Sequence, residues 1–132
     1  MKLSTLLTIA SLLAIAFGLA FTGEPAIMLT QYGLVVDPAS AIMSRFFGAT
    51  LITLGLVIFL ARSVTDAYAR NAIVQGLLVG SLLSLAVAVF AQVRGVINAF
   101  GWSTVAIYGL LTLGYVYFAL GARGRGENRT LG

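Results

Sequence analysis

Arg45 places a full positive charge inside an otherwise uncharged stretch of the chain. It interrupts the apolar and small residues Ala-Ile-Met-Ser-Arg-Phe-Phe-Gly-Ala-Thr-Leu at positions 41–51. A guanidinium has five N–H donors and no acceptor, so in a dry site it needs oxygen acceptors around it. Two interpretations follow. Arg45 binds an anionic ligand or partner, or it has a structural role near the membrane surface, held by Glu24, by Asp37 or by carbonyls of the 23–37 loop.

Hydroxyl groups form the second set of candidates. Helical spacing places Tyr108, Thr112 and Tyr115 on one side of a predicted helix near the C-terminus. A similar polar and small stripe follows the first predicted helix: Ser4, Thr8, Ser11, Gly18 and Thr22. Such stripes line a cavity for a small or lipid-like ligand, or they hold helices together through interhelical hydrogen bonds. Both alternatives remain open from the sequence.

Residue types that carry most enzyme chemistry are missing. Cysteine and histidine are absent, and none of the four acidic residues falls within a long apolar stretch. General acid–base and metal chemistry therefore lack candidate residues. We expect a protein that is not an enzyme, with no metal site and no cofactor. The eight lysines and arginines are too few and too dispersed for a nucleic-acid-binding surface.

The composition predicts the elements that carry these side chains. Of the 132 residues, 60% are hydrophobic and 9% charged, against about 25% charged in soluble domains. The apolar segments approach or exceed the ~20 residues that a helix needs to cross a bilayer. The predicted fold is an all-α integral membrane four-helix bundle in one domain, 1–122, followed by a short basic cytoplasmic tail, 123–132. The predicted helices are about 3–22, 38–61, 67–94 and 102–121.

Charges outside the helices predict the orientation. Lysine and arginine accumulate on the cytoplasmic side of membrane proteins. Six of the eight cations fall on one side if the chain crosses four times: Lys2, Arg62, Arg70, Arg123, Arg125 and Arg129. On the other side, two acids and two arginines cancel. We therefore expect both termini in the cytoplasm.

Small residues predict where helices approach one another. Gly76, Gly80 and Ser84 recur every four residues in the third span, which favours close packing within the monomer or, as the alternative, a homodimer interface. Gly48 and Gly55 lie on the same side of the second span as Arg45, so that side is expected to pack against protein.

Two further patterns concern the second span. Asp37-Pro38 is typical of a helix start, with Asp37 as N-cap and proline at the first helical position. The apolar segment 23–38 before it is expected to rest at the interface or to cap the outer mouth of the bundle. Residues 51–59 agree with residues 110–118 at six of nine positions, which suggests a 2+2 pseudo-repeat of helical hairpins.

A resemblance rests on Ser44-Arg45-Phe46-Phe47-Gly48-Ala49, followed by Leu54-Gly55-Leu56 and Ala61-Arg62. These residues resemble the second helix of a bacterial family of small four-helix integral membrane proteins of unknown function. The resemblance implies the fold and a multi-pass location in the bacterial inner membrane, but no activity. A second arginine common in the family's third helix is missing from residues 80–84, so a two-arginine anion site is not expected.

Two functions fit this chain. The first is a non-catalytic accessory or scaffold subunit that packs against other membrane proteins or itself and holds a lipid or apolar ligand. The alternative is a small dimeric transporter of an anionic or amphiphilic substrate that uses Arg45. The absence of an intramembrane acid counts against proton- or cation-coupled transport.

Overall fold

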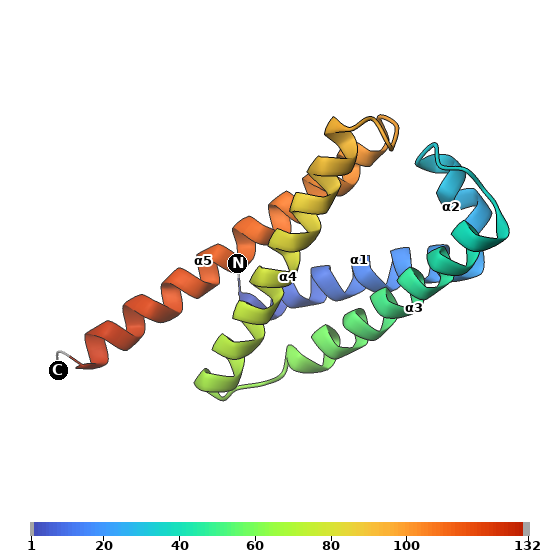
Figure 1. Ribbon diagram of the computed structural model, residues 1–132. Coiled ribbons are helices and arrows are strands. Elements are labelled where there is room, and N and C mark those ends of the chain that lie inside the picture. Colours follow the sequence, from blue (N-terminus) through green and yellow to red (C-terminus); the bar gives the residue numbers. More distant parts are fainter. Residues whose placement is uncertain (1, 131–132) are drawn as a thin grey trace.

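The computed structural model describes the backbone of residues 2–130 and the side chains of residues 2–122. Its helices are α1 (Leu3–Gly23), α2 (Pro25–Gln31), α3 (Pro38–Ala61), α4 (Ala67–Val93) and α5 (Gly101–Thr130) (Figure 1). Four segments are long and apolar enough to cross a membrane: Leu3–Gly23, Pro38–Ala61, Ala67–Val93 and Gly101–Ala122. The chain is therefore an all-helical, multi-pass membrane protein.

The predicted spans agree closely with the helices. The first three begin at the expected residues and end within one residue of the expected positions. The last begins one residue early, and its backbone continues as helix to Thr130, so no break in secondary structure marks the predicted boundary at residue 122. Residues 131–132 of the predicted tail lie outside the described residues.

Local hydrogen bonds explain where α3 and α4 begin. The Asp37 carboxylate accepts from the Ser40 N–H at 2.7 Å, and the Ser40 hydroxyl oxygen accepts from the Asp37 N–H at 2.9 Å. This capping box, with Pro38 at the first position, confirms the predicted N-cap. Asp66 caps α4 by accepting from the Ala69 N–H at 2.8 Å.

The segment expected to be a loop, 23–38, contains the short helix α2. Pro25 takes the first helical position, where its missing N–H costs nothing. Gly33, two residues after the end of α2, lies in the left-handed region (φ +72°). This conformation lets the Leu34 N–H bond back to the Leu29 carbonyl at 2.9 Å. Leu29 and Tyr32 are buried. The segment therefore covers one end of the molecule with specific side chains.

The four long helices form two antiparallel pairs, α1 with α3 and α4 with α5, which diverge from each other (Figure 1). The pairs meet in a cluster of buried side chains near the start of the chain. We call it the core cluster: Leu3, Leu6, Leu7, Ala10, Ile58, Val74 and Tyr115.

The α1–α3 pair is held by main chains in direct contact. A Cβ atom on Gly18 would lie 2.7 Å from the Gly48 carbonyl oxygen, and one on Gly48 would lie 2.6 Å from the Gly18 carbonyl oxygen. A Cβ on Gly55 would lie 3.0 Å from the Ser11 carbonyl oxygen. These three glycines let the backbones approach as close-packed membrane helices do. Gly48 and Gly55 therefore face protein, as the sequence indicated.

The glycines of α4 behave differently, and the prediction that Gly80 meets a neighbouring helix within the monomer is wrong. A Cβ atom added to Gly76 or Gly80 would find nothing within 4 Å. The four-residue spacing favoured a packed face, but α4 turns these residues toward the gap between the two pairs. Ser84, the third member of the stripe, borders the same gap.

The two similar segments make unlike contacts. Gly55 meets α1 inside its own pair, whereas its counterpart Gly114 faces Leu6 of the other pair, with a Cβ placed 2.9 Å from the Leu6 side chain. The likeness of residues 51–59 and 110–118 is thus present in sequence without equivalent packing at these glycines.

Replacement of Gly48 by leucine tests the backbone contact. Because the new side chain would meet main-chain atoms of α1, overpacking should lower stability by about 1–3 kcal/mol or more. Unfolding of the purified protein in mild detergent measures the change. Ala49→Leu, at the exposed neighbouring position, is the matched control, and equal stability of the two variants would contradict the packing described.

A candidate apolar cavity between the helical pairs

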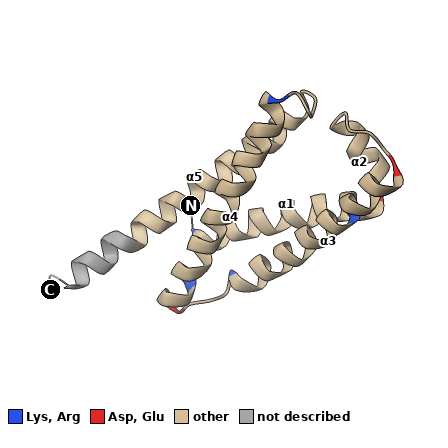
Figure 2. Cartoon of the chain, in the orientation of Figure 1, with Lys and Arg blue, Asp and Glu red and all other residues tan. Residues whose placement is uncertain are grey.

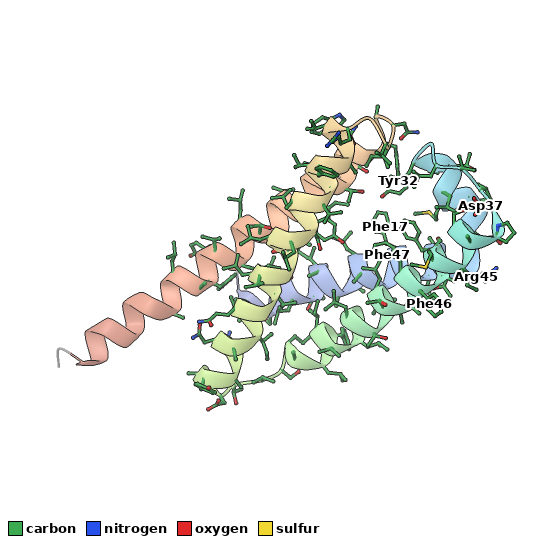
Figure 3. The ribbon with its side chains drawn as sticks, in the orientation of Figure 1. Phe17, Tyr32, Asp37, Arg45, Phe46 and Phe47 are labelled. Atoms are coloured by element: carbon green, nitrogen blue, oxygen red, sulfur yellow. The ribbon has the colours of Figure 1, made fainter. Side chains whose placement is uncertain are left out.

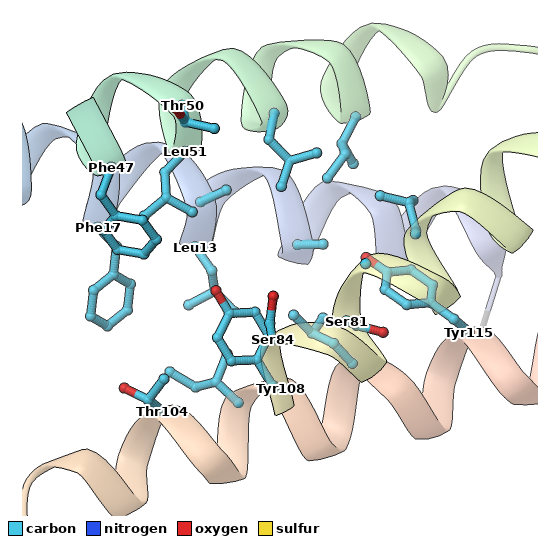
Figure 4. Close-up of a pocket in the computed structure, with 18 of the residues that line it drawn as sticks. Leu13, Phe17, Phe47, Thr50, Leu51, Ser81, Ser84, Thr104, Tyr108 and Tyr115 are labelled. Atoms are coloured by element: carbon cyan, nitrogen blue, oxygen red, sulfur yellow. The ribbon is translucent and has the colours of Figure 1, made fainter. Parts of the chain in front are cut away.

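The gap between the two helical pairs holds a cavity of about 310 Å³. All four long helices contribute to its wall, and Figure 4 shows many of the side chains. The α1–α3 pair and Tyr32 supply Ala10, Leu13, Ala14, Phe17, Phe21, Tyr32, Phe47, Thr50, Leu51, Leu54 and Ile58. The α4–α5 pair supplies Gly76, Leu77, Gly80, Ser81, Ser84, Thr104, Ile107, Tyr108, Leu111 and Tyr115.

A group of polar contacts closes the end of the cavity near α2. The hydroxyls of Tyr32 and Thr104 are 2.6 Å apart. The Asn98 main-chain N–H donates to the Tyr32 carbonyl at 3.0 Å, and its side-chain amide donates to the Gln31 carbonyl at 2.8 Å. We call Tyr32, Asn98 and Thr104 the latch, because they join the two pairs at this end.

Aromatic rings surround the latch on the cavity side. The rings of Phe21 and Tyr32 are stacked with centroids 6.0 Å apart, and Phe47 meets Phe21 edge-on at 5.0 Å. Phe100 meets Tyr32 edge-on at 5.1 Å from the α4–α5 connection. These contacts give this end an apolar lining and a fixed shape.

The core cluster closes the opposite end of the cavity, where Tyr115 is only 2% exposed. Between the ends, α3 and α4 make little contact, so the wall is incomplete on that side. Leu54 of α3 remains 42% exposed there. Gly76 and Gly80 of α4 lack side chains that could cover the gap. The cavity is therefore bordered by an opening that faces the surroundings of the helices.

Most polar groups in the wall already have partners. Thr50 donates to the Phe46 carbonyl at 2.9 Å, as hydroxyls inside helices commonly do. Ser81 donates to the Leu78 carbonyl and accepts from Thr112, each at 3.0 Å. Thr112 thus joins α5 to α4 through a hydrogen bond. This is the interhelical role that the sequence left open for its polar stripe, rather than the role of lining a cavity.

Ser84 and Tyr108 are the polar pair that faces the open part of the cavity. Their hydroxyls come from α4 and α5 and point in the same direction, toward α1 (Figure 4). Among the side chains of residues 2–122, none that lines the wall is charged. Of the three hydroxyl residues predicted near the C-terminus, Tyr108 and Tyr115 therefore reach the cavity, and Thr112 does not.

Arg45 lies outside the cavity. Phe17, Tyr32 and Phe47 point toward the space between the two helical pairs (Figure 3). Arg45 and Asp37 lie on the opposite side of the α1–α3 pair, away from that space. The other charged residues of the described range 2–122 lie at helix ends and in connections (Figure 2). Arg45 is therefore not placed to bind a ligand held in the cavity.

Arg45 instead caps the C-terminus of α1. Its Nη1 donates to the Thr22 carbonyl at 2.8 Å, and the hydroxyl of Ser44 donates to the Phe21 carbonyl at 3.3 Å. Both carbonyls belong to the last turn of α1, which has no further helical N–H groups to bond. A cation there also interacts favourably with the negative end of the helix dipole.

The acids expected near Arg45 have other positions. Asp37 accepts the N-cap bond of α3, and Glu24 is exposed between α1 and α2. Within residues 2–122, whose side chains are described, neither forms an ion pair with Arg45. The interpretation that an acid partners Arg45 is therefore not what the structure shows, because Arg45 bonds to the Thr22 carbonyl at the end of α1.

Sequence reasoning missed the aromatic end of the cavity. Phe17 and Phe21 are four residues apart and so share a face of α1, which was a usable pattern. Tyr32 directly precedes Gly33, the positive-φ glycine just after α2, and its burial there depends on contacts with other elements. Phe47 was visible only as part of the Arg-Phe-Phe sequence.

Comparison of this chain with known protein families, curated proteins and solved structures found no match.

Loss of the Arg45 cap should destabilise the protein without any dependence on the acids. Arg45→Leu is expected to cost about 0.3–1 kcal/mol, the usual size of a cation at a helix C-terminus. In a double-mutant cycle in detergent, Glu24→Gln and Asp37→Asn should each add independently to Arg45→Gln. A coupling above about 0.5 kcal/mol with either acid would contradict the capping role and restore the ion-pair interpretation.

Proposed function

We propose that this protein is a non-catalytic membrane protein that holds an apolar, lipid-like ligand between its two helical pairs, and that it serves other membrane proteins as an accessory subunit. The observation that carries the proposal is the cavity between the core cluster and the latch. Its wall is almost entirely apolar, and its volume of about 310 Å³ lies at the lower end of the ~300–1,000 Å³ typical of ligand sites.

The environment of the chain supports an apolar occupant. Protein interiors are close-packed, and a void of this size forfeits many dispersion contacts when empty. The gap beside α3 and α4 opens toward the region that lipid chains would fill around membrane-spanning helices. A hydrophobic chain could therefore enter from the bilayer without crossing water.

The position of Arg45 gives less support to the alternative function, a dimeric transporter of an anionic or amphiphilic substrate. That hypothesis placed an anionic substrate at Arg45, but Arg45 bonds to the end of α1 and does not border the cavity. The accessory role draws on the large exposed apolar side chains along the helices, such as Leu60, Val87 and Leu110. Lipids cover such side chains, and so do the helices of partner proteins or of a second copy.

The proposed orientation has both termini in the cytoplasm, in the bacterial inner membrane. Three cations lie at the end of the molecule where α1 begins and α3 joins α4: Lys2, Arg62 and Arg70 (Figure 2, blue). Under the preference of cations for the cytoplasmic side, the latch then faces the outer side of the membrane.

Single cysteines test this orientation, since the natural chain has none. Thr30→Cys, at an exposed position of α2, should react with a membrane-impermeant thiol reagent in intact cells. Thr65→Cys, in the exposed α3–α4 connection, should react only after the membrane is permeabilised. The reverse pattern would overturn the topology.

Filling the cavity from α4 tests the proposed function. Gly80→Leu adds a side chain where nothing lies within 4 Å, so the fold should persist while the space for a ligand shrinks. Mass spectrometry of the purified protein should then show fewer bound lipid-like molecules than in wild type.

Ala86→Leu is the control, because it adds the same bulk at an exposed position of α4 outside the cavity wall. An equal amount of bound lipid in wild type, Gly80→Leu and Ala86→Leu would contradict the proposal.

A further inference from the structure

The hydroxyl groups in the cavity wall restrict the chemistry of the ligand. Of the wall's polar side chains, Tyr32 pairs with Thr104, and Thr50 and Ser81 bond to carbonyls of their own helices. These groups are satisfied without a ligand. Ser84 and Tyr108 interact with each other through their hydroxyls and face the open part of the cavity, and Tyr115 lies at its closed end.

Their depth also matters. Tyr108 is four residues further into α5 than Thr104 of the latch, about 6 Å along the axis at 1.5 Å per residue. A polar group of the ligand that reached this depth would leave water and would need a hydrogen bond from the protein. The phenol of Tyr108 is a donor as well as an acceptor, and Ser84 stands beside it.

Charge is the second restriction. The described part of the wall has no cation or acid to pair with an ionised group, and an unpaired charge in such a site costs several kcal/mol. Arg45 bonds to the end of α1 on the other side of the α1–α3 pair (Figure 3). A phosphate or carboxylate headgroup would therefore have to remain outside the cavity.

We propose that the cavity binds an uncharged ligand made of an apolar chain and a hydrogen-bond acceptor, such as a ketone, quinone or ester carbonyl, and that Tyr108 with Ser84 donates to this acceptor. The inference rests on the proposed function and deepens it. It assigns the apolar chain to the side chains of Leu51, Leu77 and Leu111 and the carbonyl to the hydroxyl pair.

Three photoactivatable probes of equal length test the inference in lipid nanodiscs that contain the full chain. One is a plain alkyl chain, one carries a ketone, and one ends in a carboxylate; each has a diazirine at the same chain position. Cross-linked residues are located by mass spectrometry. The ketone should label the cavity wall about 2- to 12-fold more than the plain chain, the range for one net hydrogen bond, and the carboxylate should label it least.

The variants show whether the hydroxyl pair causes the preference. Tyr108→Phe removes one oxygen and should reduce ketone labelling to the level of the plain chain. Tyr117→Phe makes the same change on α5 at a side chain that is 67% exposed, and it should leave the preference unchanged. Ser84→Ala is a second variant, expected to weaken the preference while Tyr108 is retained.

The outcomes separate this inference from the function on which it rests. Equal labelling of the wall by ketone and plain chain, or a preference that survives Tyr108→Phe, overturns the assigned ligand class while the apolar site stands. Carboxylate labelling as strong as that of the ketone overturns the requirement for an uncharged ligand. If all probes label exposed Val79 and Val87 as much as the wall, the proposed function falls as well.

Discussion

The direct contact between the main chains of α1 and α3 fixes the first helical pair, and the positions of the other helices follow from it. Where Gly18 faces Gly48, a single added carbon atom would collide with a carbonyl oxygen. In lipid, apolar side chains gain little by leaving the bilayer, so close backbone approach is a main source of helix association. The α1–α3 pair is therefore a unit of its own, and the α4–α5 pair is added to it.

The second pair is joined to the first at its two ends. The core cluster makes an apolar contact near the start of α1, and the latch makes a polar contact beside α2. Because α4 presents Gly76 and Gly80 between these contacts, the middle of the molecule is left open. The same residue type thus has opposite effects: glycine brings α3 against α1 but leaves space between α4 and α3.

Local rules predicted the parts of the fold that depend on local sequence. The spans followed from apolar segments of membrane length, and Asp37-Pro38 marked the start of α3 because both the cap and the proline act within one turn. The face of α3 that contains Gly48 and Gly55 was also recognised. In contrast, α2 is a helix of seven residues and is stabilised by burial of Leu29 and Tyr32 against other elements, which no local pattern reveals.

The site depended on contacts between distant residues and was predicted only in part. Helical spacing placed Tyr108, Thr112 and Tyr115 on one face. It could not show that the two tyrosines line the cavity while Thr112 bonds to Ser81 of α4. Arg45 drew attention because charge is rare in membrane spans, yet its acceptor is a carbonyl 23 residues earlier in the chain, and any carbonyl of the preceding helix would have looked equivalent in the sequence.

The two helical pairs stay apart along their middle and enclose an apolar ligand. An experimental structure of the protein in a lipid environment would decide whether they do. We expect elongated non-protein density between Leu51, Gly80 and Tyr108, bounded by the core cluster and the latch. A structure in which α4 lies directly against α3, with Gly80 in contact with Leu51 and no space between the pairs, would contradict it.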